Sequence, residues 1–145
     1  MADKYPQLKL ENQICFPLYA CAKEITKAYK PFLDELDLTY TQYITMMVIW
    51  EHKELKVKEV GKCLYLDSST LTPLLKRLEE KGYITRRRSA EDERDLIVTV
   101  TEQGEALKEK AGSVPEKLGS CIALEPRKAQ ALYALLYELL GKLTK

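Results

Sequence analysis

Residues 64–104 have the sequence LYLDSSTLTPLLKRLEEKGYITRRRSAEDERDLIVTVTEQG, in which a predicted helix precedes a predicted hairpin. Four leucines recur at the i, i+3, i+4, i+7 spacing of one helix face: Leu71, Leu74, Leu75 and Leu78. Asp67 and the hydroxyl residues after it are N-cap candidates, Pro73 falls in or just beyond the first turn, and Gly82 is a stop signal. The pattern therefore predicts a helix over residues 68–81.

A charged β-hairpin is predicted next, over residues 83–101. YITRRR (83–88) and DLIVTVT (95–101) are rich in β-branched and aromatic residues, as strands are, and the polar SAEDER connects them. Short helices followed by such a hairpin make up a winged helix-turn-helix. We therefore predict a mainly α fold with a small β-hairpin, in the order α-α-α-α-β-β-α-α.

Further helices flank this unit. Apolar residues at helical spacing predict them over 8–36 (fading at Pro31), 41–52, 57–65, from Thr101 to a break around Gly112 and Pro115, and after Pro126. We expect a single winged-helix domain, 1–145, in which 40–101 bind DNA, with 68–81 as the recognition helix and 83–101 as the wing.

The terminal regions, 8–36 and 116–143, carry more apolar surface than a monomer buries. In the last helix the apolar residues wrap well past one face, and such a helix must be buried from several sides. A central core helix is one explanation. Because the middle helices supply their own core, we favour a homodimer interface made by the terminal helices.

Composition restricts the class of protein. The 145 residues are 46% apolar and 31% charged with a net charge of +1, so nucleic-acid contacts must come from a local arrangement of charge. No apolar run is long enough for a signal peptide or a membrane span, so we expect a cytoplasmic protein. A single histidine, His52, and the lack of C-x-x-C, G-x-G-x-x-G and Walker motifs predict no metal, no cofactor and no enzyme.

The start of the predicted recognition helix carries hydroxyl groups that can approach bases or phosphates: Ser68, Ser69 and Thr70. Lys76 and Arg77 lie off the leucine stripe and can hold phosphates, although charges opposite leucines usually form only a solvated face. At the hairpin tip, Arg94 can enter a narrow minor groove, with a neighbouring carboxylate to fix its rotamer. Residues 86–95 carry four positive and four negative side chains, which favours one positioned arginine over a general basic patch.

On these residues the sequence resembles the MarR family of dimeric winged-helix repressors, most specifically in the D-x-R of Asp92-Glu93-Arg94 and the T-x-x-G of Thr101–Gly104. LENQICFPLYACAKEITKAYKPFLDELDLTYTQY (10–43) is similar to the organic-hydroperoxide-sensing, OhrR-type branch. The resemblance implies a homodimer on a pseudo-palindromic operator. It also implies these roles: Ser68, Ser69 and Thr70 face bases, Arg77 and Arg86 support backbone contacts, Arg94 enters the minor groove, and Asp92 orients Arg94.

Cys15, followed by Phe16 and Pro17, stands out within an apolar helical segment. If the helix starts near Cys15, Pro17 falls in its first turn at no cost and the thiol lies at the positive end of the dipole. If the helix starts at Leu8, Pro17 kinks it. We prefer the first arrangement. Only a thiolate attacks a peroxide O–O bond efficiently, and a helix's positive end and phenol donors stabilise a thiolate, so Cys15 is the predicted redox sensor.

Three tyrosines are candidates for the sensor pocket. Tyr19 lies at i+4 from Cys15, on the same predicted helix face. Tyr29 and Tyr40 are too distant to reach Cys15 within one helix. In OhrR-type repressors, matching tyrosines hydrogen-bond the reactive sulfur across the dimer and Tyr19 lines the same pocket, so the resemblance implies these roles here.

The remaining cysteines receive different predictions. Cys21 and Cys63 are expected in the core. OhrR-type repressors have either a lone sensor cysteine, trapped by a small thiol, or a second cysteine near the last helix that forms an intersubunit disulfide. Cys121, expected in a polar turn before the last helix, resembles the resolving cysteine of the second form.

The predicted function is a repressor that releases its operator when an organic hydroperoxide oxidises Cys15. One alternative is a MarR-type repressor released by a small aromatic ligand, with Cys15 incidental. Another is a thiol-dependent peroxidase, although such enzymes are usually thioredoxin-like α/β proteins. A helical interaction module without DNA binding is disfavoured by the placement of Arg94.

Overall fold

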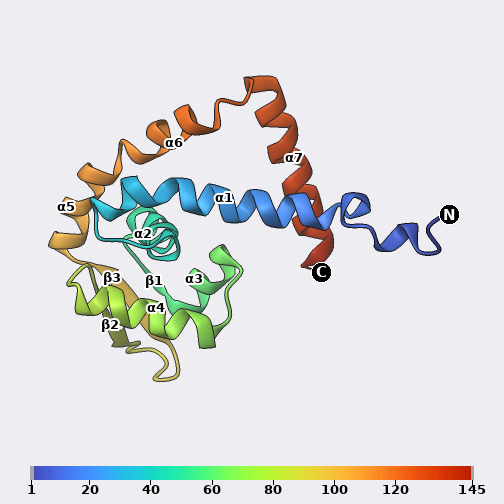
Figure 1. Ribbon diagram of the computed structural model, residues 1–145. Helices are drawn as coiled ribbons and strands as arrows, with labels where there is room; N and C mark the ends of the chain where they lie inside the picture. Colours follow the sequence, from blue (N-terminus) through green and yellow to red (C-terminus); the bar gives the residue numbers. More distant parts are fainter. Residues whose placement is uncertain (1, 145) are drawn as a thin grey trace. The chain divides into compact units, whose positions relative to one another are not determined.

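The computed structural model describes residues 2–144 (Figure 1). The chain forms two compact units that divide after Val114. The elements, in chain order, are the 3-10 turns η1 (Pro6–Leu8) and η2 (Leu10–Asn12), α1 (Cys15–Asp34), α2 (Tyr40–His52), β1 (Glu54–Lys56), α3 (Val57–Leu64), α4 (Ser68–Glu80), β2 (Ile84–Arg88), β3 (Leu96–Val100), α5 (Glu102–Ala111), α6 (Val114–Ile122) and α7 (Pro126–Leu143). The mainly helical winged-helix fold predicted from the sequence is confirmed, and β1, α6 and the two 3-10 turns are additional elements.

The sheet of the first unit has three antiparallel strands in the order β1-β3-β2. The predicted hairpin is its β2–β3 half, with Arg86 opposite Val98. On the other edge of β3, Glu54 of β1 lies opposite Thr99. The sequence prediction missed β1 because three residues are too few to show the alternation of a strand.

The core of the first unit lies where α2 and α4 meet the sheet. All four leucines of the predicted stripe on α4 are buried, which confirms that helix and its orientation. Met46 and Ile49 of α2 and Val98 of β3 are fully buried in the same cluster. The leucine stripe thus holds α4 against the sheet and leaves its opposite face, with Lys76 and Arg77, in solvent.

The T-x-x-G motif has a structural explanation. The Thr101 hydroxyl caps α5 by accepting a hydrogen bond from the Gly104 N–H at 3.0 Å, while the Thr101 N–H donates to the Tyr83 carbonyl at 3.1 Å. A Cβ on Gly104 would lie 2.3 Å from that carbonyl oxygen, so only glycine fits. The indole N–H of Trp50 donates to the Gly104 carbonyl at 2.8 Å. The motif therefore fastens the start of α5 to the base of the wing and to α2.

Three helix boundaries differ from the predicted ranges. The helix predicted over 8–36 begins only at Cys15, and the turns η1 and η2 precede it. The first helix does not fade at Pro31 but continues to Asp34, where the buried Leu33 anchors its end and Lys30 pairs with Asp34 at 3.0 Å. The predicted break after α5 exists, but a new helix, α6, follows it. Pro115 is the second residue of α6, a position where its missing N–H costs nothing.

In the second unit, α7 begins at Pro126 as predicted, and most of its large apolar side chains are exposed to solvent. Tyr133 and Tyr137, one turn apart on this helix, have ring centroids 4.8 Å from each other. No helix within residues 2–144 is long and apolar enough to cross a membrane.

Candidate functional site

The start of α4 presents the predicted hydroxyl groups to solvent. Asp67 is the N-cap: its carboxylate accepts hydrogen bonds from the Thr70 N–H at 2.9 Å and from the Ser69 hydroxyl at 2.7 Å. The Ser69 hydroxyl, and after it the Thr70 N–H, lower the pKa of Asp67 below its usual value. Ser68, Ser69 and Thr70 are all exposed. The cap thus fixes the backbone that carries them and leaves them open to a ligand.

Arg86 joins the wing to α4. Its backbone N–H donates to one carboxylate oxygen of Glu79 at 3.0 Å, and its guanidinium donates to the other at 3.1 Å. The guanidinium hydrogen bond lowers the pKa of Glu79. Arg86 is half-buried at the junction between β2 and α4, where it links the base of the wing to that helix.

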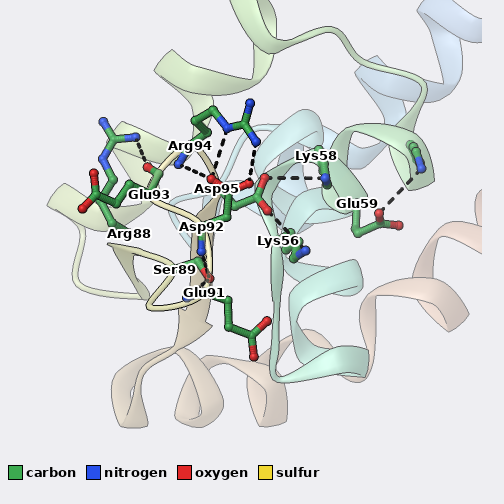
Figure 2. Close-up of polar contacts among 11 residues, drawn as sticks. Lys56, Lys58, Glu59, Arg88, Ser89, Glu91, Asp92, Glu93, Arg94 and Asp95 are labelled. Carbon is green, nitrogen blue, oxygen red and sulfur yellow. Dashed lines mark hydrogen bonds and ion pairs between the residues drawn. The ribbon is translucent and has the colours of Figure 1, made fainter.

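The wing tip holds Arg94 on a short carboxylate clamp (Figure 2). Both carboxylate oxygens of Asp92 accept from the Arg94 guanidinium at 3.2 Å, and one also accepts from the Arg94 N–H at 3.0 Å. These hydrogen bonds lower the pKa of Asp92. The Arg94 side chain is 90% exposed, so the clamp orients the guanidinium while most of the side chain remains in solvent. The two residues that the sequence paired are thus in contact.

Ser89 is a part of the tip that the sequence analysis missed. It is buried, and its hydroxyl accepts hydrogen bonds from the Glu91 N–H at 3.1 Å and the Asp92 N–H at 3.4 Å. On the other side of the tip, the Arg88 guanidinium donates to the Glu93 carbonyl at 3.0 Å. A serine before a polar turn is a signal for this type of local hydrogen bond.

Cys15 is the first residue of α1, as the preferred arrangement predicted, and Pro17 is the third. Ile14 precedes the helix and has no capping side chain, and the first turn contains no acidic residue within the described chain. Cys15 is exposed. The exposed thiol therefore lies at the positive end of a 20-residue helix that has no side-chain counter-charge of its own there.

Tyr29 and Tyr40 pack together, and Tyr43, which the sequence analysis missed, completes the cluster. The ring centroids are 4.8 Å apart for Tyr29 and Tyr40, 5.7 Å for Tyr29 and Tyr43, and 6.4 Å for Tyr40 and Tyr43. Burial, and then the neighbouring phenols, raise the pKa of Tyr29 to about 12. Burial likewise raises the pKa of Tyr40 and of Tyr43. All three phenols therefore remain neutral donors at physiological pH.

Within one chain this cluster lies far from Cys15. Tyr29 is fourteen residues along α1 from Cys15, which corresponds to about 21 Å. Tyr19, one turn from Cys15, is 65% exposed. Within a single chain the predicted pocket is thus divided into two parts, one at the start of α1 and one where the later part of α1 packs on α2.

Three cysteine predictions need correction. Cys21 and Cys63 were expected in the core and are both exposed. Cys21 lies in the first half of α1, where nearly every residue is exposed, and Cys63 lies outside the buried face of α3. Cys121 was expected in a turn and instead lies in the last turn of α6, where it is also exposed.

Comparisons with known proteins show which family the chain belongs to. A family model described as the transcriptional regulator SarA/Rot matches residues 27–111. The organic hydroperoxide resistance transcriptional regulator of Bacillus subtilis (strain 168) is 50% identical over 146 residues, with 99% of this chain and 97% of that protein covered.

Two solved structures share the fold. Reduced AbfR of Staphylococcus epidermidis bound to DNA superposes with a TM-score of 0.78 at 34% identity, over 99% of this chain and 100% of that one. A mutant MarR from E. coli complexed with operator DNA has a TM-score of 0.79 at 22% identity, over 96% and 99% of the two chains, and shows the shared fold alone. The chain therefore belongs to the MarR family of winged-helix transcriptional regulators, in the branch of the organic hydroperoxide resistance regulators.

Proposed function

We propose that this protein is a homodimeric, cytoplasmic repressor that releases its operator when an organic hydroperoxide oxidises Cys15. The observation that carries the proposal is the position of Cys15, exposed as the first residue of α1 at an end without a capping or acidic side chain. A thiolate there gains from the helix dipole and is open to an oxidant. The name of the B. subtilis relative points to the same class of oxidant.

The chemistry balances with a hydroperoxide as the only oxidant. The Cys15 thiolate attacks the terminal oxygen of ROOH, an S–O bond forms, the O–O bond breaks, and the alkoxide takes up a proton to leave as ROH. The product is a sulfenic acid. The thiol of Cys121 in the second subunit, or a small thiol, then attacks that sulfur, an S–S bond forms, and the oxygen leaves as water. One oxidation event per site makes the protein a sensor and not an enzyme.

A second copy of the chain supplies what one chain lacks. The tyrosine cluster lies about 21 Å along α1 from its own Cys15, so it can serve that thiol only from a partner subunit. The chain also exposes apolar side chains that a partner would cover. On α7 they include Leu132, Leu135, Leu136, Leu139 and Leu143.

The DNA-binding face follows from the exposed groups of the first unit. Ser68, Ser69 and Thr70 at the start of α4 would contact base edges in the major groove, and Arg94 on the wing would enter the minor groove. Arg77 and Lys76, exposed on the same helix, would contact phosphates, with Arg86 supporting the geometry. In a dimer the two α4 helices would lie about 34 Å apart, one turn of DNA.

Release requires an energy difference between the bound and released forms. A covalent link between Cys15 and the partner's Cys121 would supply it, because the link is compatible only with some arrangements of the two subunits. AbfR, a relative of this chain, has been solved both reduced on DNA and in a disulfide form.

Release by an aromatic ligand is the weaker candidate. A cleft of about 490 Å³ exists in the first unit, but its lining is mainly charged or polar: Asp34, Asp37, Thr39, Gln42, Arg77, Glu80 and Lys81, with Leu38. An aromatic ligand favours an apolar pocket with few polar groups.

The proposal is tested by operator titration. The probe is a duplex selected from a random DNA library on the reduced wild-type protein. Its affinity is measured by fluorescence anisotropy before and after cumene hydroperoxide for the wild type, Cys15→Ser and Cys121→Ser. We expect loss of binding in the wild type and none in Cys15→Ser. Cys121→Ser should lose binding only when a small thiol is added. Release of Cys15→Ser by the peroxide would refute the proposal.

A further inference from the structure

One carboxylate joins the wing tip to the start of α3 (Figure 2). The Asp95 carboxylate lies 3.2 Å from the Lys56 ammonium and 3.5 Å from the Lys58 ammonium. Lys56 is the last residue of β1, and Lys58 is the second residue of α3. The Asp95 side chain is only 16% exposed, against 43% and 59% for the two lysines. A mostly buried acid in the wing thus pairs with two lysines of the helix-turn-helix body.

The backbone of Asp95 also closes the tip. Its N–H donates to the Asp92 carbonyl at 3.0 Å, and its carbonyl accepts from the Ser89 N–H at 2.8 Å. Asp92 in turn carries the guanidinium of Arg94. The position of Asp95 therefore sets the position of the whole turn on which Arg94 is clamped.

These ion pairs contribute little to stability, because partly exposed pairs are screened by water. Their more important effect is on the position of the wing tip. The Asp92 clamp orients Arg94 within the tip, but it does not determine where the tip lies relative to α4. The contact of Asp95 with Lys56 and Lys58 fixes where the tip lies, because both lysines belong to elements that pack on the core.

We propose that Asp95 is a positioning residue for Arg94: by holding Lys56 and Lys58 it fixes the wing so that Arg94 meets the minor groove. The inference rests on the proposed role of Arg94 in DNA binding. It opposes what charge alone predicts, since removing a negative charge near DNA should strengthen binding to phosphates. Loss of the Asp95 charge is instead expected to weaken operator binding, and only when Arg94 is present.

A double-mutant cycle tests this. Affinity for the selected operator duplex is measured at one salt concentration for the reduced wild type, Asp95→Asn, Arg94→Ala and the double variant. We expect Asp95→Asn to weaken binding about two- to fivefold, the range of exposed ion pairs. In the Arg94→Ala background the same change should leave affinity unchanged or slightly raise it. Thermal melts check that each variant is folded.

The matched control is Glu59→Gln, which removes a negative charge paired with Lys62 on the same helix, α3, at 3.6 Å. It should not weaken binding. If Asp95→Asn tightens binding, or weakens it equally in both backgrounds, the proposed role of Asp95 is overturned and that of Arg94 stands. Arg94→Ala with wild-type affinity overturns the proposed role of Arg94, and the inference with it.

Discussion

The rings of Tyr29 and Tyr40 lie 4.8 Å apart, where α1 and α2 pack against each other. Burial raises the pKa of both phenols, and that of Tyr29 reaches about 12, so neither ionises at the pH of the cell. Two neutral O–H donors held side by side are suited to stabilise an anion such as a thiolate. The cluster gains this role only if a partner subunit brings its Cys15 to it.

Tyr29→Phe and Tyr40→Phe are therefore expected to slow oxidation of Cys15. A hydrogen bond to a charged group contributes about 1.5–3 kcal/mol, so loss of one should slow sulfenic acid formation about tenfold or more. The rate is measured by mass spectrometry of alkylated samples after a cumene hydroperoxide pulse. Tyr83→Phe, at the base of the wing, is the control and should react like the wild type. Equal rates in all variants would exclude the pocket.

Gly104→Ala is expected to destabilise the first unit. The new Cβ would lie 2.3 Å from the Tyr83 carbonyl oxygen and 2.9 Å from a Val100 methyl group. Overpacking of this kind costs about 2–3 kcal/mol, which denaturant unfolding will detect. Gly112→Ala is the matched control, because its Cβ would meet no atom closer than 3.5 Å. It should be neutral or stabilising, and a similar loss in both variants would contradict the close approach at Gly104.

Because Asp67 caps α4, the stability of the folded protein is expected to depend on pH in the acid range. The lowered pKa of Asp67 means that its contribution to stability is fully present above its ordinary value of 3.8 and is lost as pH falls through the lower folded value. Asp67→Ala should therefore have a lower Tm than the wild type at pH 7 and at pH 5, and the gap should close in stronger acid. Thermal melts across this pH range measure it. If the difference in Tm between the two proteins disappeared between pH 7 and pH 5, a group other than Asp67 would be responsible for it.

Leu139→Glu tests the dimer. Leu139 is one of the exposed leucines of α7, and a charge buried there would weaken association about tenfold or more. Sedimentation equilibrium gives the dissociation constant. Lys128→Glu, at the polar start of the same helix, changes charge without changing an apolar position and should leave the dimer intact. Unchanged association of Leu139→Glu would place the interface elsewhere.

Local patterns were sufficient to predict the helix-turn-helix and the start of α1. Four leucines at helical spacing after the Asp67 cap can form only one face, and the structure buries all four. Pro17 correctly favoured a helix start at Cys15, because proline is best tolerated in the first turn, although Pro31 later in the same helix does not end it. Such rules involve neighbours within a few residues, and a sequence displays those directly.

Other features depend on contacts between distant residues. Nothing local links Asp95 to Lys56, or marks β1 as a strand, because each acquires its role only when β3 pairs with β1. The cysteine errors have a related cause. Cys63 has apolar neighbours, but a helix turns 100° per residue, so such neighbours do not place a cysteine in the core. Cys21 faces away from Cys15, but it lies in a stretch of α1 where nearly every residue is exposed.

The central claim is that oxidation of Cys15 itself releases the DNA, and one kinetic comparison tests it most directly. The reduced wild-type protein on a fluorescent operator duplex is mixed with cumene hydroperoxide at several concentrations. DNA release is followed by anisotropy, and loss of the Cys15 thiol by alkylation and mass spectrometry of the same samples. We predict that thiol loss has a rate proportional to peroxide concentration and that release does not precede it. Release of the operator while the Cys15 thiol remains reduced would contradict the account.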